Sequence, residues 1–286
     1  WFPPLVTGIV ITAIGLYLLP VGIKYAAGGA AAFQMNAPEW GDFSKWGLAL
    51  VVIFVSLGIK FFTRGTMSSA AILVGLIAGY IVGYLTGAVN LGGVSKAAWF
   101  AIPQPFKYGI EFSAYAIIGM CLMSIVSAIE TVGDISGIAK GGANREATDK
   151  ELAGGTYADG VGSFIAGLFG GLPNTSFSQN VGLISMTGVM SRSVVTLGAL
   201  FLVACGLIPK VGAVVAAMPI SVLGGGVIVM FGMVVSAGIS MLADVNWNRR
   251  NMIILAMSMS IGLGLQAVPK SMQHLPDSLE MLMVSG

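Results

Sequence analysis

The chain has 286 residues, of which 56% are hydrophobic and 9% are charged, and its formal net charge is +2. This composition leaves too little polar surface to cover a soluble globule of this length, and the near-neutral charge gives no argument for a nucleic-acid partner. Helices are expected rather than a β-barrel, because the apolar segments run for about 17 to 25 residues instead of alternating in short strands.

Eight apolar segments of span length follow one another along the chain, and a shorter one comes directly after a polar interruption. Their predicted bounds are 3–22, 46–62, 68–86, 113–139, 154–172, 191–209, 215–242 and 250–268, with the shorter helix at 180–190. Lys and Arg are slightly more numerous on the side that holds the loop 140–151, so we place that side in the cytoplasm. The sequence therefore predicts an all-α polytopic membrane protein.

Neither cysteine chemistry nor a metal site is expected. Cys121 and Cys205 both fall in apolar segments, where small packing residues are a simpler interpretation than a disulfide or a metal ligand. The single histidine, His274, lies in a polar connection, and one histidine alone does not make a metal site. We therefore predict no metal and no cofactor.

The stretch from Pro173 to Gly182 interrupts the apolar pattern with amides and hydroxyls. Polar backbone survives at membrane depth only where protein or a watery cavity satisfies its hydrogen bonds. A broken helix beside the N-terminus of a half-helix is how many transporters hold a ligand near the middle of the bilayer. We therefore expect this stretch to line a binding site.

Three carboxylates in neighbouring apolar segments strengthen that expectation. A carboxylate costs about 3 kcal/mol at the centre of a membrane helix, so it usually faces a pathway or a partner. Glu130 and Asp134 are four residues apart and share a helix face, and we favour ligand or proton handling for Glu130. For Asp134 a structural role is equally open. For Asp159, expected near the start of its helix, stabilisation by N-terminal amides competes with a proton-relay role.

Uncharged polar side chains occupy the break itself. Gln179 and Asn180 each offer a donor and an acceptor, which suits a planar heterocycle with alternating N–H and C=O groups. Capping of the half-helix by Ser178 or Asn180 is the structural alternative, and the two roles are compatible. Phe177 can stack on a ring, although a lone aromatic side chain in an apolar protein is more often a packing residue.

These residues resemble the signature of the nucleobase–ascorbate transporters, also called nucleobase:cation symporters type 2. The resemblance is carried by the run Gln179-Asn180-Val181-Gly182-Leu183-Ile184-Ser185-Met186-Thr187-Gly188 with Ser191-Arg192. Upstream, Glu130-Thr131-Val132-Gly133-Asp134 is similar to the acidic motif of the family, and Ala158-Asp159-Gly160 is similar to its ninth-span aspartate region. Downstream, Pro219-Ile220-Ser221-Val222-Leu223-Gly224-Gly225-Gly226 is similar to the bacterial xanthine and urate permeases.

The resemblance implies a fold of two inverted seven-span repeats, arranged as a core and a gate domain. On that template residues 1–112 and 210–286 are gate-domain spans, and residues 113–209 are core-domain spans that carry the substrate motif. The chain would then begin at the fifth span and lack the last one. We therefore expect it to be a fragment of a longer protein.

The resemblance also implies which groups touch the substrate. Glu130 and Gln179 would hydrogen-bond the purine ring, and the backbone near Phe177 and Ser178 would bind its carbonyl groups. A glutamine at position 179 accompanies xanthine or uric acid in this family, whereas a glutamate accompanies uracil.

A second set of residues is implied in proton coupling. Asp159 and Asn180 would support the site and couple it to protons, with Asp134 assisting. Val181 departs from the asparagine of many xanthine permeases, which leaves xanthine versus uric acid open.

Three functions are compatible with these residues. The first is proton-coupled uptake of an oxidised purine, xanthine or uric acid, across the bacterial inner (cytoplasmic) membrane. The second is a carrier of uracil or another anion with the same fold, and the third is a membrane-embedded enzyme with Glu130 and Asp159 as acid and base. The enzyme lacks a nucleophile with a base beside it, so we predict a transporter and not an enzyme. Its partners would be the purine, the proton and the lipid bilayer, with a homodimer also considered.

Overall fold

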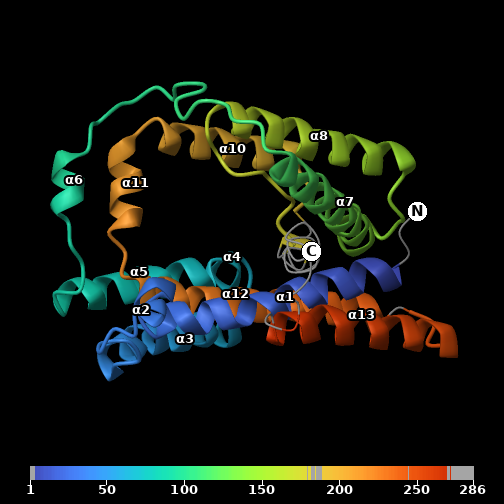
Figure 1. Cartoon of the computed structure of the whole chain (residues 1–286), viewed down its shortest axis with the longest axis horizontal. Helices are drawn as coiled ribbons and strands as arrows, with labels where there is room; N and C mark the ends of the chain where they lie inside the picture. Colours follow the sequence, from blue (N-terminus) through green and yellow to red (C-terminus); the bar gives the residue numbers. More distant parts are fainter. Residues whose placement is uncertain are drawn as a thin grey trace. The chain divides into compact units, whose positions relative to one another are not determined.

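The computed structural model describes residues 4–178, 180–181, 184, 189–243, 245–268 and 271. In this part of the chain all regular secondary structure is helical (Figure 1). The helices, in chain order, are α1 (Pro4–Ala26), α2 (Ala30–Gln34), α3 (Phe43–Phe62), α4 (Thr66–Ser69), α5 (Ala71–Leu85), α6 (Gly92–Lys96), α7 (Ala114–Ala143), α8 (Asp149–Leu168), α10 (Arg192–Gly206), α11 (Pro209–Ala216), α12 (Ile220–Ala243) and α13 (Arg249–Ala267).

Four of these helices, α1, α3, α7 and α12, are long and apolar enough to cross a membrane. The pair α10 and α11 meets the same criterion when taken together, but the two helices are bent by 87°. The corner between them is visible in Figure 1. The bend falls just before Pro209, the first residue of α11, which has no N–H to donate back into α10. The described residues therefore give an all-α polytopic membrane protein with four spans, or five if the bent pair is one.

The helices occupy the predicted segments, but fewer of them are span-length apolar helices than the eight predicted. The segment predicted at 68–86 is divided at Ala70 into α4 and the shorter α5. The segment predicted at 191–209 ends at Gly206, and α11 covers residues 210–214, which were expected to connect two spans, with one residue before and two after them. Both differences arise where a local break ends a helix that hydropathy alone would continue.

Two further helices are more polar than expected for spans. α8 carries Asp149, Lys150 and Glu151 in its first turn, and α13 starts with Arg249 and Arg250. The short helix predicted at 180–190 lies mostly outside the described residues.

The chain divides into two compact units. The first contains residues 1–17, 104–188 and 234–286, and the second contains residues 18–103 and 189–233. The predicted gate and core domains (1–112, 113–209 and 210–286) concern parts that move in transport. That division stays a prediction.

The second unit has a core between α3, α5 and the first part of α12. Val52 of α3 and Val222 of α12 are its largest fully buried apolar side chains, and α3 and α5 lie side by side (Figure 1). Leu48 is also buried, and Leu76, Val82 and Met218 pack against this cluster. Each of these helices therefore buries the apolar side chains of one face against its neighbours.

Three consecutive glycines of α12 let different helices approach it closely. A Cβ on Gly224 would collide with the backbone of α1 at Ala26, and one on Gly225 would meet the Ala49 carbonyl of α3. A Cβ on Gly226 would meet the Leu76 side chain of α5. Small residues of this kind replace side-chain bulk by backbone proximity in membrane helices.

The first unit brings α7 and α8 against each other. A separate apolar cluster joins Leu5 and Ile9 of α1 to Leu242 of α12. Gly133 of α7 faces Thr7 of α1 so closely that a Cβ would lie 3.0 Å from the threonine side chain. α7 is therefore held from two sides, by α1 and by α8.

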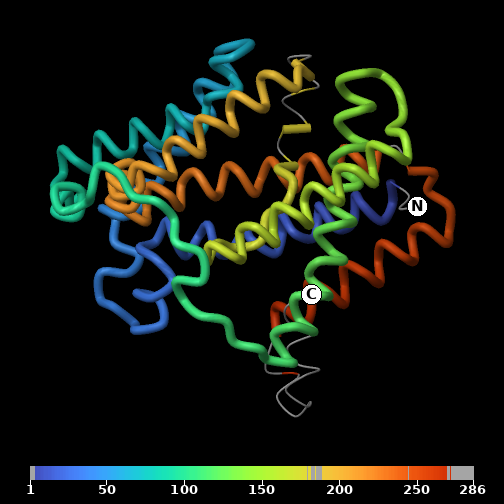
Figure 2. The backbone as a smooth tube through the Cα atoms, turned by 90° about the horizontal axis from the view of Figure 1, so that it is seen from above, coloured from blue at the N-terminus to red at the C-terminus, as the bar shows by residue number. Residues whose placement is uncertain are grey.

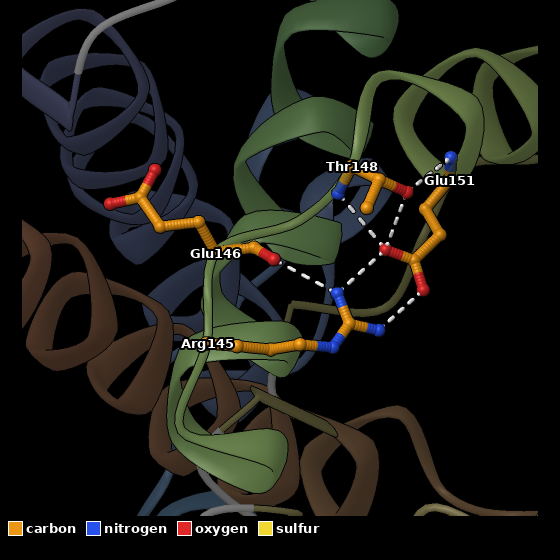
Figure 3. Close-up of polar contacts among 4 residues, drawn as sticks. All are labelled: Arg145, Glu146, Thr148 and Glu151. Carbon is orange, nitrogen blue, oxygen red and sulfur yellow. Dashed lines mark hydrogen bonds and ion pairs between the residues drawn. The ribbon is translucent and has the colours of Figure 1, made fainter.

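The start of α8 is fixed by a network of four residues (Figure 3). Thr148 Oγ1 accepts the backbone N–H of Glu151 at 3.3 Å, and Glu151 Oε2 accepts the backbone N–H of Thr148 at 3.0 Å. Arg145 donates to both carboxylate oxygens of Glu151, at 2.9 and 2.6 Å, and to the carbonyl of Glu146. These hydrogen bonds, those from Arg145 first, hold the pKa of the Glu151 carboxyl well below its usual range. Together they make Asp149 the first residue of α8.

The connection between α6 and α7, residues 97–113, contains no helix, as the green segment of Figure 2 shows. Its first part is attached to the corner between α10 and α11. The N–H of Ala101 donates to the Leu207 carbonyl at 3.1 Å, and Lys210 Nζ lies 4.4 Å from the centre of the Trp99 ring. The segment therefore has defined partners although it is irregular.

Candidate substrate site

The polar break after α8 begins where the helix ends at Leu168, and residues 171–177 have no regular structure. Ser163 of α8 ties this segment down, because its hydroxyl accepts the N–H of Asn174 at 2.8 Å and donates to the Asn174 carbonyl at 3.0 Å. Pro173 needs no hydrogen-bond partner for its nitrogen. The loop 171–178 is thus held along α8 while its hydroxyls stay available to α7.

Glu130 and Asp134 share one face of α7, as their spacing predicts, and Ser178 of the loop lies between them. Ser178 Oγ is 3.1 Å from Glu130 Oε1 and 3.0 Å from Asp134 Oδ2. Thr175 Oγ1 donates to the other oxygen of Glu130 at 3.4 Å. Two carboxylates and two loop hydroxyls therefore form one cluster.

Asp134 is the most deeply enclosed member of this cluster. Its exposed fraction is 2%, and Ser176 Oγ donates to its Oδ2 in addition to Ser178. The other oxygen, Oδ1, is buried and has no hydrogen-bond partner among the described residues. Glu130 is half-buried, so the two acids of the motif have different environments.

Asp159 lies in the middle of α8, not near the start of its helix as expected. The reason is the cap at Thr148, which starts the helix several residues before the predicted bound of 154. Two hydroxyls of α7 reach the carboxylate: Ser127 Oγ is 3.2 Å and Thr131 Oγ1 is 3.0 Å from Asp159 Oδ2. Side-chain hydroxyls of α7, rather than helix N-terminal amides, therefore satisfy this carboxylate.

The remaining predicted residues lie at the end of the break. Phe177 is 55% exposed and Asn180 is exposed, and the N–H of Asn180 donates to the Phe177 carbonyl at 2.9 Å. Ser178 is buried, with an exposed fraction of 4%. Gln179 lies outside the described residues. The roles assigned to these side chains stay predictions.

Four hydroxyl residues that contact the acids were not named individually from the sequence, although the stretch 173–182 was expected to line a site: Ser127 and Thr131 of α7, and Thr175 and Ser176 of the loop. A signal was present for the first two. Ser127, Thr131 and Asp134 recur at intervals of four and three residues, the spacing of one helix face. The loop pair could not be found this way because its contacts depend on how the break folds.

The residues of the acidic cluster do not line either of two hollows found in other parts of the molecule. One, of about 570 Å³, lies in the second unit beside Asn90, Lys96 and Pro219. The other, of about 310 Å³, lies in the first unit beside Tyr108 and Phe164. Neither hollow contains a cluster of acids. In the described part of the chain no group of three or more His, Cys, Asp or Glu side chains is arranged to hold a metal ion.

The sequence matches a known family over nearly its whole length. The chain belongs to the Permease family (Xan_ur_permease), whose match covers residues 1–271. The family, its bacterial members and the apolar helices make this chain part of a multi-pass protein of the bacterial inner membrane. Permeases are transporters and not enzymes, so the membrane-embedded enzyme is not retained.

Individual relatives align along the entire chain. It is 41% identical over 286 residues to a putative purine permease of Clostridium perfringens, covering 62% of that protein. It is 37% identical over 288 residues to the xanthine permease of Bacillus subtilis and 38% identical over 288 residues to the uric acid transporter UacT of Escherichia coli. In each case all of this chain is aligned, with 64% and 58% of those two relatives. The chain thus spans less than two thirds of the length of these relatives.

Proposed function

We propose that the protein takes up an oxidised purine, xanthine or uric acid, together with protons across the inner membrane. The contact between the acidic motif of α7 and the polar break carries this proposal: Ser178 lies within hydrogen-bond distance of both Glu130 and Asp134. Polar groups at membrane depth need such partners or a ligand. The names of the bacterial relatives, which include xanthine and uric acid permeases, support the purine class.

Glu130 is proposed as the principal acid for the purine. It is half-buried, and among the described residues its two oxygens have hydrogen-bond contacts with hydroxyls of the loop, at 3.4 and 3.1 Å. A carboxylate in a dry site makes a charge-assisted hydrogen bond to an N–H of the ring, which is roughly twice as strong as a neutral one. The exposed Phe177 ring and the amides of Gln179 and Asn180 would complete the contacts with a flat heterocycle.

Asp159, Asn180 and Asp134 are proposed to support the site and couple it to protons. Asp159 is held against α7 by two hydroxyls, and Asp134 is buried beside Ser176 and Ser178. Acids that face one another inside a membrane protein and not the lipid are typical of proton pathways. A uracil carrier of the same fold is the alternative. Competition of labelled purine uptake by unlabelled uracil distinguishes the two.

The test replaces Glu130 in the full-length protein. We expect Glu130→Gln to lower uptake of labelled xanthine or uric acid about tenfold to a hundredfold, because a charge-assisted hydrogen bond becomes a neutral one in a desolvated site. Uptake is measured in cells with protein at the membrane quantified by immunoblot, and with unlabelled xanthine, uric acid, uracil or guanine as competitor.

The matched control is Glu146→Gln. Glu146 is an exposed loop glutamate whose carboxylate points away from the Arg145–Glu151 pair in Figure 3, so uptake should be unchanged. Full uptake by Glu130→Gln would refute the assignment of Glu130. Competition by uracil but not by either purine would favour the alternative substrate.

A further inference from the structure

Three carboxylates of the first unit are joined by hydroxyls into one continuous chain. Its first part runs from Asp159 of α8 to Glu130 of α7. Ser127 Oγ lies 3.2 Å from Asp159 Oδ2 and also 3.2 Å from Thr175 Oγ1. Thr175 Oγ1 in turn lies 3.4 Å from Glu130 Oε2. Two hydroxyls therefore connect the carboxylates of Asp159 and Glu130 through three successive contacts.

The second part runs from Glu130 to Asp134 through Ser178. The Ser178 hydroxyl is within hydrogen-bond distance of Glu130 Oε1, at 3.1 Å, and of Asp134 Oδ2, at 3.0 Å. Glu130 is thus the central member, since a different oxygen of its carboxylate belongs to each part. Ser178 is 4% exposed, so water does not replace either contact from outside.

The number of protons in this chain follows from its contacts. A hydroxyl has one proton and can donate only one hydrogen bond. The first part has three contacts and two hydroxyl protons, and the second part has two contacts and one. Each part therefore lacks one proton, which must sit on a carboxyl group if no contact is to be a repulsion between lone pairs. Since Glu130 can carry only one, an arrangement in which every contact is a hydrogen bond needs a proton on two of the three carboxyls.

We infer that Ser127 and Thr175 relay a proton between Asp159 and Glu130, as positioning residues that let the two acids exchange charge without moving. This inference rests on the proposed proton-coupled uptake. In the step, the Asp159 proton passes to Ser127, the Ser127 proton to Thr175, and the Thr175 proton to Glu130 Oε2. Asp159 becomes a carboxylate, Glu130 becomes a carboxylic acid, and both hydroxyls end with one proton each.

The geometry suits both end states of this step. All three contacts are hydrogen bonds before and after the transfer, with only their direction reversed. When Asp159 is charged, its Oδ2 accepts from both Ser127 and Thr131, at 3.2 and 3.0 Å, which stabilises the anion. When Glu130 is neutral, it no longer offers a charged acceptor to a purine. The relay therefore links the charge on the substrate acid to the charge on α8.

Few other charges act on this chain of groups. In the first unit, the described residues of α1 and α12 and the loop 169–178 contain no charged side chain. On α8 the others are in the first turn, at Asp149, Lys150 and Glu151, and α7 carries Lys140 near its C-terminal end. In these elements the charged groups nearest to the chain of hydroxyls along the sequence are thus its own three acids.

The test separates coupling from binding in the full-length protein reconstituted into liposomes. Uptake of labelled xanthine or uric acid driven by an imposed pH gradient is compared with exchange of the same label at equal pH on both sides. For Ser127→Ala we expect gradient-driven uptake to fall about tenfold and exchange to fall much less. This is smaller than the ~10²–10⁴ for loss of a proton-transfer group, because a water can enter the space of the missing hydroxyl.

Two companion variants define the result. Ser127→Thr keeps a hydroxyl and should keep the wild-type ratio of driven uptake to exchange. Ser124→Ala removes a hydroxyl one turn earlier, which donates to the Met120 carbonyl of the same helix at 2.8 Å, and should also leave the ratio unchanged.

The other outcomes count against the relay. An unchanged ratio in Ser127→Ala, an equal loss of both activities, or a ratio in Ser127→Thr as low as in Ser127→Ala would each overturn it while the proposed function stands. If the wild-type protein takes up neither purine, or ignores the pH gradient, the proposed function fails and the relay fails with it.

Discussion

At the scale of single residues, Gly224 is a position where one methyl group decides whether two helices fit. A Cβ there would be closer to the backbone of Tyr25 and Ala26 than real Cβ atoms ever come, and backbone cannot rotate away as a flexible side chain can. Gly232, two turns later on the same helix, has nothing within 4 Å of the same atom. The two glycines lie on the same helix, but only at Gly224 does the packing of a neighbouring helix exclude a side chain.

We therefore expect Gly224→Ala to destabilise the protein by about 1–3 kcal/mol, the usual cost of overpacking. Gly232→Ala is the matched control, and it should be neutral or slightly stabilising because alanine favours helix more than glycine does. Thermal unfolding of the detergent-solubilised full-length protein measures both. Equal stability of the two variants would contradict the close approach of α1 and α12.

The acids of the candidate site could be predicted from the sequence, but their hydroxyl partners only in part. A carboxylate in an apolar segment is conspicuous because it is costly there, whereas a serine or threonine in a membrane helix can satisfy itself on the carbonyl four residues earlier. Ser136 does so, donating to the Val132 carbonyl at 2.7 Å. Which hydroxyls turn to another helix depends on packing, as Ser127 and Thr131 show.

At the scale of helices, hydropathy predicts where helices occur better than where they end. α7 follows its predicted segment, because a long apolar run without proline continues as helix, whereas α12 begins only at Ile220, after Pro219, and not at residue 215 as predicted. The ends at Leu207–Pro209 and at Thr148 depend on a few residues that a hydropathy window averages away. The consequence at Thr148 is the larger one, because the start of α8 decides where Asp159 falls along it.

The start of α8 should respond to pH through Glu151. Its pKa lies below the usual value of about 4.3, so its hydrogen bonds stabilise the folded helix start fully above that value and are lost as the pH falls through the lowered pKa. We expect hydrogen-exchange protection of residues 149–153 to stay constant from about pH 7 to about pH 5 and to be greater than in Glu151→Gln. Equal protection in the two proteins above about pH 5 would contradict this role.

At the scale of the whole molecule, α7 divides the chain between the two sides of the membrane. It has 30 residues, which is about 45 Å of helix and more than the ~30 Å hydrocarbon core. Glu111 and Glu146 flank it, and both are exposed. These two positions should therefore face opposite compartments.

Cysteine labelling tests this arrangement in a full-length protein without Cys121 and Cys205. We expect Glu146→Cys to react with a membrane-impermeant maleimide only in inside-out vesicles, because the basic loop 140–151 is placed in the cytoplasm. Glu111→Cys should react only in right-side-out vesicles. Labelling of both from the same side would rule out α7 as a span.

The cap at Thr148 fixes where α8 begins, and so it also fixes the direction in which each later side chain of the helix points. Each added residue turns a helix by about 100°, so a one-residue insertion between Thr148 and Asp159 would swing the carboxylate off the face that meets Ser127 and Thr131. An insertion before Arg145 would leave the direction of the Asp159 side chain unchanged, because the cap would re-form at Thr148. Length changes in this part of the chain should therefore be tolerated only on the loop side of the cap.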